Sequence, residues 1–140
     1  VYHYARTGAE PAATLAEPRG WLLEPGAALI RAGLVRDLAA EIGAAMLDES
    51  IAYLTSYSVP ESPWVRAWHI QDWMPFNLKK LRAYLRERDV GRVTVKKRGS
   101  PLTPEALMTK LKLKGEAART LVLTRGAGQP VVIVCAEQPV

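Results

Sequence analysis

Residues that could carry out acid–base or metal chemistry are few in this 140-residue chain, and their spacing is poor. His3 and His69 are far apart, and no Cys/His cluster has the spacing of a metal site. Asp48 and Glu49 are adjacent acids, but we expect them in a solvated turn, which is a commoner setting than general acid–base catalysis. The sequence therefore predicts no catalytic residues and no metal site.

The candidate nucleophiles lack the partners that would activate them. Ser50, Ser56 and Ser58 have no histidine nearby in sequence and no sharp strand-to-helix turn around them. Cys135, the single cysteine, lies in an apolar run, so we expect a small buried hydrophobic residue rather than a reactive thiol. It cannot form an internal disulfide, which suits a reducing, cytoplasmic location. No glycine-rich phosphate-binding signature precedes a predicted helix, so no cofactor site is predicted.

The distribution of charge is the strongest functional signal. Residues 79–125 hold 14 of the 19 Lys and Arg residues and only four acidic residues, so this block is formally +10. Residues 1–78 hold five basic and nine acidic residues, which is formally −4. A folded core is indifferent to the sign of surface charge, so the block indicates a polyanion or an acidic protein surface as partner.

Ten basic residues of this block are candidate contacts to nucleic-acid phosphates. They are Lys79, Lys80, Arg82, Arg86, Lys96, Lys97, Arg98, Lys112, Lys114 and Arg125. Neutralising a phosphate backbone needs several cations on one surface, and arginine can also stack on bases. Two alternatives stay open. The block is a solvated face, because a helix dipole alone favours lysines at a helix end, or it docks on an acidic surface of another domain or protein.

The overall composition indicates a globular chain, with 49% hydrophobic and 24% charged residues. No apolar run approaches the roughly 20 residues that a membrane-spanning helix needs, so no membrane partner is expected. Four tryptophans could stack on nucleobases, but their positions in or beside predicted strands favour core packing. These are Trp21, Trp64, Trp68 and Trp73.

The first half of the chain is expected to hold three strands and one helix. We place strands at residues 1–7, 21–23 and 51–55, a loop at 8–20 and one helix at 25–42. Apolar residues recur every four positions from Ile30 to Ile42, which predicts a single apolar stripe on that helix. Gly43 is expected to end it.

The second half is expected to mix strands and helices. We place strands at residues 64–70, 92–98, 120–124 and 131–135, and helices at 78–88 and 104–115. Asn77 and Thr103 are expected helix caps, and Pro104 suits a first helical position. The last two strands are expected to form an antiparallel hairpin with a loop of about five residues. These elements predict the α+β class, with helices layered on partly antiparallel sheets.

Particular segments resemble a family of bacterial class I methyltransferase-like proteins. Residues 21–34 (WLLEPGAALIRAGL) and 47–56 (LDESIAYLTS) resemble the segment that precedes the THUMP-like domain in that family. Residues 75–82 (PFNLKKLR), 90–104, 111–115 (LKLKG) and 121–125 (LVLTR) resemble the THUMP-like domain itself. The turn at Lys97-Arg98-Gly99 and the pair Thr124-Arg125 are the most specific pieces.

The resemblance implies two units: a small ferredoxin-like βαβ unit at residues 1–62, and a THUMP-like α/β unit with a partly antiparallel sheet and a C-terminal hairpin at 63–140. It also implies an S-adenosylmethionine-dependent methyltransferase domain N-terminal to this chain, which would then be a piece of a longer protein that binds no cofactor and catalyses nothing alone. THUMP domains bind RNA, notably tRNA, and deliver it to a fused modifying domain. RNA and the protein's own methyltransferase domain are therefore the expected partners.

Overall fold

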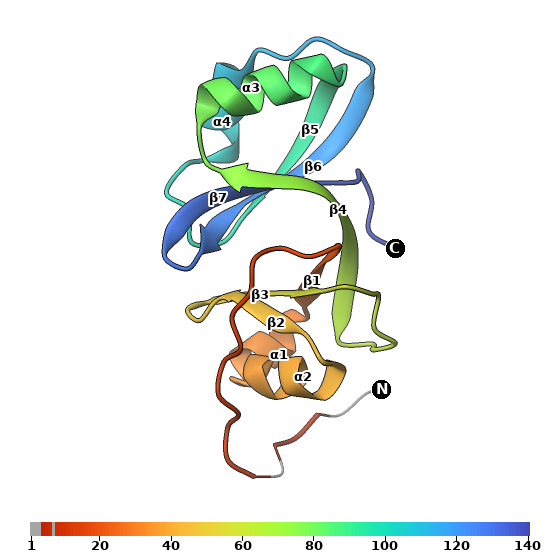
Figure 1. The fold of residues 1–140 in the computed structure, drawn as a ribbon, viewed down its shortest axis with the longest axis vertical. Helices are drawn as coiled ribbons and strands as arrows, with labels where there is room; N and C mark the ends of the chain where they lie inside the picture. The colour runs from red at the N-terminus through yellow and green to blue at the C-terminus, as the bar shows by residue number, and fades with distance from the viewer. Residues whose placement is uncertain (1–3, 7) are drawn as a thin grey trace.

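The chain folds around one mixed seven-stranded sheet, with strand order β2-β3-β1-β4-β7-β6-β5. The structure is a computed structural model and describes residues 4–6 and 8–140. Its elements are β1 (Trp21–Pro25), α1 (Ala27–Arg31), α2 (Val35–Ile42), β2 (Ala45–Asp48), β3 (Ile51–Ser56), β4 (Val65–Pro75), α3 (Leu78–Glu87), β5 (Val90–Lys97), α4 (Pro104–Leu111), β6 (Ala117–Gly126) and β7 (Gln129–Cys135). Figure 1 shows two halves joined through β4, and the fold is of the predicted α+β class.

The N-terminal half, β1 to β3 with α1 and α2, is a split βαβ arrangement. β3 lies between β1 and β2 and pairs antiparallel with both. The helices cover one face of these strands (Figure 1), and Leu23 and Leu54 of the sheet pack with Leu29 and Leu38 of the helices in one apolar cluster. Burying these side chains stabilises the half by roughly 1.5–3 kcal/mol each.

The predicted single helix at residues 25–42 is wrong, because the chain forms two helices there. Gly33 adopts φ 72°, a left-handed conformation that glycine enters without a steric penalty. Its amide donates to the carbonyl of Ile30, and the amide of Leu34 donates to that of Leu29, which is the hydrogen-bond pattern of a glycine-ended helix. The apolar stripe survives the break, since Leu34 and Leu38 are both buried.

Two strand predictions in this half need correction. Residues 4–6 of the strand expected at 1–7 are not in a strand, and residues 1–3 and 7 lie outside the described part of the chain. β2 was missed, because its four residues are all buried and show no alternation of apolar and polar side chains. Gly43 ends α2 as expected, with φ 68°.

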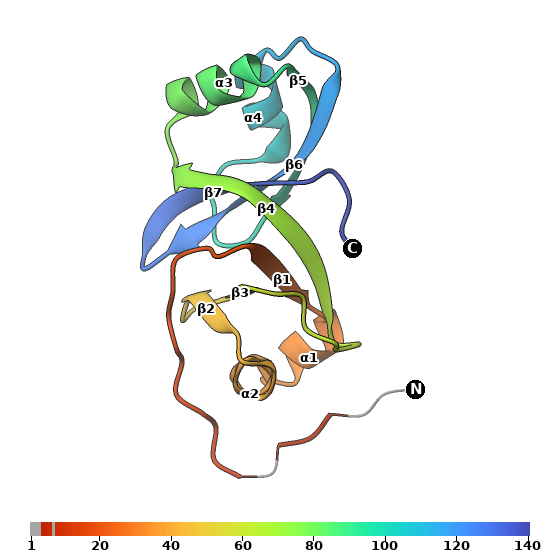
Figure 2. The same cartoon turned by 45° about the vertical axis from the view of Figure 1, so that its right-hand side comes forward.

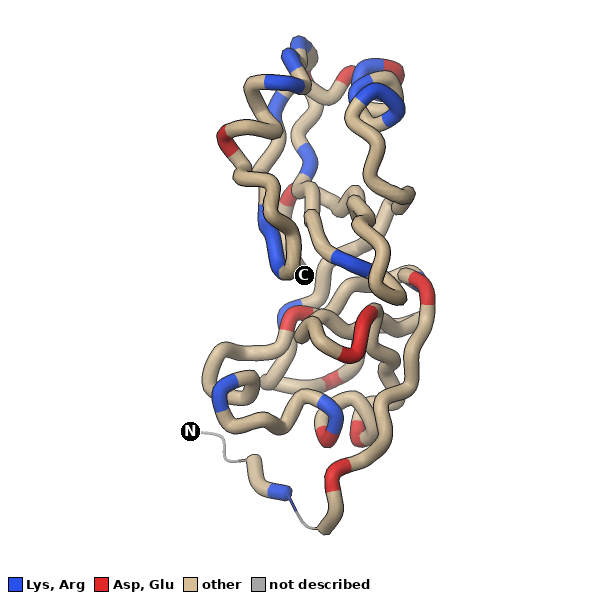
Figure 3. Tube along the Cα trace, turned by 90° about the vertical axis from the view of Figure 1, so that its left-hand side faces the viewer, with Lys and Arg blue, Asp and Glu red and all other residues tan. Residues whose placement is uncertain are grey.

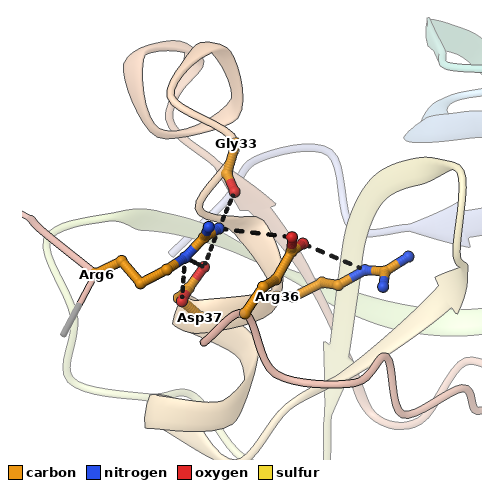
Figure 4. Close-up of polar contacts among 5 residues, drawn as sticks. Arg6, Gly33, Arg36 and Asp37 are labelled. Carbon is orange, nitrogen blue, oxygen red and sulfur yellow. Dashed lines mark hydrogen bonds and ion pairs between the residues drawn. The ribbon is translucent and has the colours of Figure 1, made fainter. Parts of the chain in front are cut away.

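An N-terminal arm runs along the outside of α2. The Arg6 guanidinium binds both carboxylate oxygens of Asp37, with nitrogen–oxygen distances of 3.0 and 3.1 Å, and also donates to the Gly33 carbonyl (Figure 4). These bonds hold the pKa of Asp37 below its usual value. Glu10 pairs with both Arg6 and Arg36. The arm is thus anchored to the helix by charge.

The C-terminal half, β5 to β7 with α3 and α4, contains both parallel and antiparallel pairing. β5 pairs parallel with β6, and β6 pairs antiparallel with β7. α3 and α4 bury Leu81, Leu85, Leu107 and Leu111 against one face of these strands. Asn77 and Thr103 cap the two helices as predicted, each accepting a backbone hydrogen bond.

Most elements of this half have bounds that differ from the prediction, and two of the differences have a clear structural cause. α4 ends at Leu111 and not at residue 115, because Lys112 adopts a left-handed conformation with φ 49°. The hairpin loop is two residues and not about five, since β6 extends to Gly126 and β7 begins at Gln129. Ala127 and Gly128 form the turn, both at positive φ, as a tight hairpin turn requires.

β4 belongs to both halves of the sheet. Its first residues pair with β1 and its last residues pair with β7, with a register irregularity between Ile70 and Asp72 where it changes partners. Figure 2 shows the strand bending over its length. A third apolar cluster joins the halves, with Leu22, Tyr53 and Trp68 from one and Val122 and Ile133 from the other. The predicted boundary at residues 62 and 63 falls just before this shared strand.

None of the helices formed by residues 4–6 and 8–140 combines the length and the apolar character needed to cross a membrane.

Candidate nucleic-acid interface

Positive charge gathers on the C-terminal half of the molecule. Figure 3 shows Lys and Arg concentrated around α3, α4 and the segments beside them, while Asp and Glu lie mostly on the N-terminal half. The ten predicted contacts all come from the C-terminal half, but the structure does not bring them onto one surface. Six of them form an outward group, Lys96 and Arg98 face the N-terminal half, and the other two belong to neither group.

The outward group begins on α3. Leu81 and Leu85 are fully buried and fix the rotation of this helix on the sheet. Lys79, Arg82 and Arg86 follow one another at intervals of three and four residues, so they lie along one side of α3. Lys80 lies on the side away from the core and is exposed.

Two arginines connect α3 to the end of α4. The Arg82 guanidinium donates to the carbonyl of Lys110, and the Arg86 guanidinium donates to the carbonyl of Lys112 at 3.2 Å. The last carbonyls of a helix lack partners within the helix, and the helix dipole makes this end attractive to cations. The arginines therefore hold the lysine-bearing end of α4 beside α3.

We call the cations of α3, the end of α4 and the segment just after it the basic face. It consists of Lys79, Lys80, Arg82, Arg86, Lys110, Lys112 and Lys114. Its five lysines are exposed, and none of them forms an ion pair within the described part of the chain. Uncompensated ammonium groups on one surface are suited to bind closely spaced phosphates.

Lys96 and Arg98 face the N-terminal half instead. The Lys96 ammonium lies 3.0 Å from a carboxylate oxygen of Glu24, and the Arg98 guanidinium lies 3.8 Å from the same oxygen. Lys96 also lies over the ring of Trp68, and Arg98 over the ring of Tyr53. Their charges are thus partly neutralised in contacts between the halves.

Two further predicted contacts lie outside the basic face and differ in exposure. They are Lys97 and Arg125. Lys97 alternates with its neighbours along β5 and is exposed. Arg125 is half-buried, and its Nε atom is buried without a hydrogen-bond partner. A Cβ added at Gly99 would come within 3.2 Å of that atom, so the turn at Gly99 packs directly on Arg125.

Asp48 has a structural role that the sequence did not indicate. It is only 6% exposed, which corrects the predicted solvated turn. Its carboxylate accepts hydrogen bonds from the amide and hydroxyl of Ser50 and from the amide of Gly128, at 3.0, 2.7 and 2.8 Å. These bonds hold the pKa of Asp48 below its usual value. Asp48 therefore fastens the β6–β7 turn onto β2, a contact between segments 80 residues apart.

The remaining residues considered for catalysis stay apart. Cys135 is fully buried, and burial raises the pKa of its thiol to about 12, as suits a core residue. His69 is exposed beside the ring of Trp21, and His3 lies outside the described residues. Within residues 4–6 and 8–140 there is no group of three His, Cys, Asp or Glu side chains that could hold a metal ion.

A pocket between the halves was also missed by sequence reasoning. It has a volume of about 410 Å³ and is lined by the N-terminal segment 15–18, β2, the end of β4 and the β6–β7 hairpin. Trp73 and Pro75 form part of its wall. No local pattern could have revealed it, because its walls come from four distant segments.

Comparisons with known proteins identify relatives of this arrangement. The family model described as "THUMP domain-like" matches residues 65–137. Two uncharacterized S-adenosylmethionine-dependent methyltransferases, from two strains of Mycobacterium tuberculosis, are each 37% identical over 102 residues, which is 72% of this chain and 28% of each relative.

A solved structure shares the fold. The crystal structure of a candidate methyltransferase from Porphyromonas gingivalis W83 matches with a TM-score of 0.74 and 24% identity. The match covers 91% of this chain and 32% of that one. This chain therefore spans less than a third of the length of the relatives that it matches.

Proposed function

Because this chain belongs to the THUMP domain-like family, we propose that it binds RNA and positions it for methyl transfer by another part of the same protein. The basic face carries this proposal. Its seven cations come from two helices and the segment after the second, and the two arginine–carbonyl bonds hold them together.

The proposed contacts are to phosphates, so they set the position of the RNA without reading its sequence. The exposed lysines Lys80, Lys112 and Lys114 make the primary contacts. Arg82 and Arg86 keep their positive charge after donating to carbonyl oxygens, and they contribute to the field of the face while orienting it. A structured RNA such as tRNA presents phosphates at the density that this surface needs.

The methyl-transfer reaction is proposed for the part of the protein that this chain does not contain. The Mycobacterium tuberculosis relatives are named S-adenosylmethionine-dependent methyltransferases, and this chain spans 28% of their length. In this proposal the cofactor and the catalytic groups belong to the remaining part, residues 63–140 are the RNA-binding THUMP-like unit, and residues 1–62 are the ferredoxin-like unit beside it. A tRNA substrate would place the protein in the cytoplasm.

The experiment is a comparison of two double variants that change the net charge equally. Lys80→Glu with Lys112→Glu alters the basic face, and Arg31→Glu with Arg66→Glu alters two exposed cations of the N-terminal half of the chain. Binding to fluorescently labelled tRNA is measured by anisotropy at constant salt.

We expect the basic-face variant to lose at least about tenfold in affinity, since each lysine–phosphate contact is replaced by repulsion. The control variant should lose much less, because its charges lie outside the basic face. Equal losses in the two variants would show that net charge alone governs binding, and would contradict the proposed site.

A further inference from the structure

The outer side of β5 is an open edge of the sheet. The sheet begins with β2 and ends with β5, so each of these strands has one neighbouring strand. Residues 14–16 cover the β2 edge. The amide of Ala16 donates to the carbonyl of Met46, and the amide of Met46 donates to the carbonyl of Thr14, at 2.9 and 2.7 Å. Within residues 4–6 and 8–140, no segment covers the outer side of β5 in this way.

The pairing of β5 shows which of its backbone groups face the open side. The amide of Arg98, directly after the strand, donates to the carbonyl of Leu123 in β6 at 3.0 Å. Backbone groups alternate in direction along a strand, so the preceding even-numbered residues also face β6 and the odd-numbered residues face away. The outward groups belong to Val93, Val95 and Lys97, and no other described segment hydrogen-bonds to them. They are available to pair with another extended chain.

The charge along this edge selects what can pair with it. Residues 90–104 contain four Lys and Arg residues and no Asp or Glu. Arg92 and Lys97 are exposed, and neither forms an ion pair within the described part of the chain. A second copy of β5 would bring the same cations opposite one another, and like charges directly opposite destabilise a strand pair. The edge therefore repels its own copies and attracts an acidic strand.

A groove beside the edge adds apolar surface. It has a volume of about 350 Å³ and lies between the start of β5 and the end of α4. Val93, Leu113 and Met108 line it, and the Met108 side chain is 50% exposed. The charged residues of its lining are both basic, Arg92 and Lys112. Every second side chain of an added strand would lie on the face that α4 covers, where apolar side chains suit this groove.

We propose that the β5 edge binds an extended protein segment with alternating acidic and apolar side chains, which joins the sheet as a further strand. The outward backbone groups of β5 pair with the segment, as in other complexes formed by strand addition. Its carboxylates lie on the face of the sheet that carries Arg92, and its apolar side chains lie toward Met108. This surface is separate from the proposed phosphate contacts, and the proposal does not rest on RNA binding.

The first test removes one outward amide. The probe is a fluorescein-labelled peptide of alternating Glu and Val with eight residues, the length of β5, and its binding to the whole chain is measured by anisotropy. Val95→Pro removes an amide that takes no part in the pairing with β6, and proline is tolerated on an edge strand at such a position. Val95→Ala is the matched control, because it shortens the same side chain and keeps the amide. We expect the peptide to bind Val95→Pro at least about tenfold more weakly than Val95→Ala.

The second test reverses one charge. Arg92→Glu alters the edge, and Arg31→Glu makes the same change at an exposed residue of the N-terminal half. Only Arg92→Glu should weaken binding of the Glu–Val peptide, by about fivefold, and it should strengthen binding of a peptide in which Lys replaces Glu.

A modified peptide keeps the proposal testable if Val95→Pro does not fold, which circular dichroism would reveal. Methylation of every backbone nitrogen removes the donors of the peptide and keeps its charge and side chains, so this peptide should not bind the wild type. Equal binding of the two peptides, or equal binding by Val95→Pro and Val95→Ala, would show that charge alone holds the peptide and would overturn the added strand. If the wild type binds tRNA but not the peptide, and Arg92→Glu weakens tRNA binding, the cations of this edge serve RNA and the proposal fails.

Discussion

Glu24 determines where two of the predicted phosphate contacts point. Lys96 and Arg98 belong to the most basic segment of the sequence, yet both lie within 4 Å of one Glu24 oxygen. No local pattern could predict this, because Glu24 is more than 70 residues away in the chain. The residues on α3 were easier to assign, since a helix repeat shows which side faces the core.

We predict that Glu24→Gln weakens the contact between the halves. The ion pairs are partly exposed, so the loss of stability should be about 0.5–1 kcal/mol, measured by urea unfolding. The same change removes the anion that neutralises Lys96 and Arg98, so affinity for tRNA should rise slightly. If Glu24→Gln unfolds at the same urea concentration as the wild type and binds tRNA with the same affinity, then Glu24 contributes neither to stability nor to the charge available for RNA.

Asp48 should make stability depend on pH. The pKa of the Asp48 carboxyl is lower in the folded protein than in the unfolded chain, where it is about 3.9. The stability that this carboxylate contributes is therefore fully present above the unfolded pKa. It is lost as the pH falls through the lower, folded pKa. We expect Asp48→Asn to cost about 1–2 kcal/mol at pH 7. The difference from the wild type in urea unfolding should shrink below about pH 4; a constant difference down to pH 2 would contradict this role.

At the scale of helices and strands, the sequence correctly predicted the features that neighbouring residues determine. The caps at Asn77 and Thr103 and the apolar stripes are set within a few residues, and they were confirmed. The strands of the second half exist with other bounds: the one expected at 64–70 runs to Pro75, and the one expected at 120–124 covers Ala117–Gly126. The break at Gly33 was missed because the apolar repeat continues through it. The arginine–carbonyl bonds that form the basic face could not be predicted, since they connect α3 to a helix end that was itself misplaced.

Two glycines fix how β5 and β6 begin. A Cβ at Gly91 would overlap the backbone of Gly115, and one at Gly115 would overlap the carbonyl of Asp89. We predict that Gly91→Ala destabilises the protein by about 1–3 kcal/mol, because the two backbones must separate. Gly26→Ala is the control, since its nearest neighbour is 3.8 Å away and its φ is −63°. The effect is measured by thermal unfolding of both variants. If Gly91→Ala and Gly26→Ala unfold at similar temperatures, the close approach of the backbones at Gly91 and Gly115 is refuted.

At the scale of the whole molecule, one strand and one apolar cluster unite two halves of opposite charge. β4 pairs with both halves, and the third cluster buries Trp68 of one against Val122 of the other. The basic face does not need the two halves to be packed together, but the pocket does. The face lies wholly in the C-terminal half, whereas the pocket exists only where the halves meet.

The shared core predicts a single cooperative unfolding transition. Tryptophan fluorescence, which reports mainly on residues 21–73, and far-ultraviolet circular dichroism should give the same midpoint in urea. Separate midpoints would mean that the halves are independently stable. A fragment of residues 63–140 should be less stable than the same residues in the whole chain, because Val122 and Ile133 would lose the partners that bury them.

The most direct test of the account is the salt dependence of tRNA binding by the unaltered chain. If the five exposed lysines of the basic face contact phosphates, the logarithm of the affinity should fall linearly with the logarithm of salt concentration, with a slope of about −3 to −5. Lys80→Glu with Lys112→Glu should bring that slope closer to zero by about 1.5. If the chain does not bind tRNA at low salt, or if the slope of affinity against salt is near zero, the claim that this surface positions RNA is contradicted.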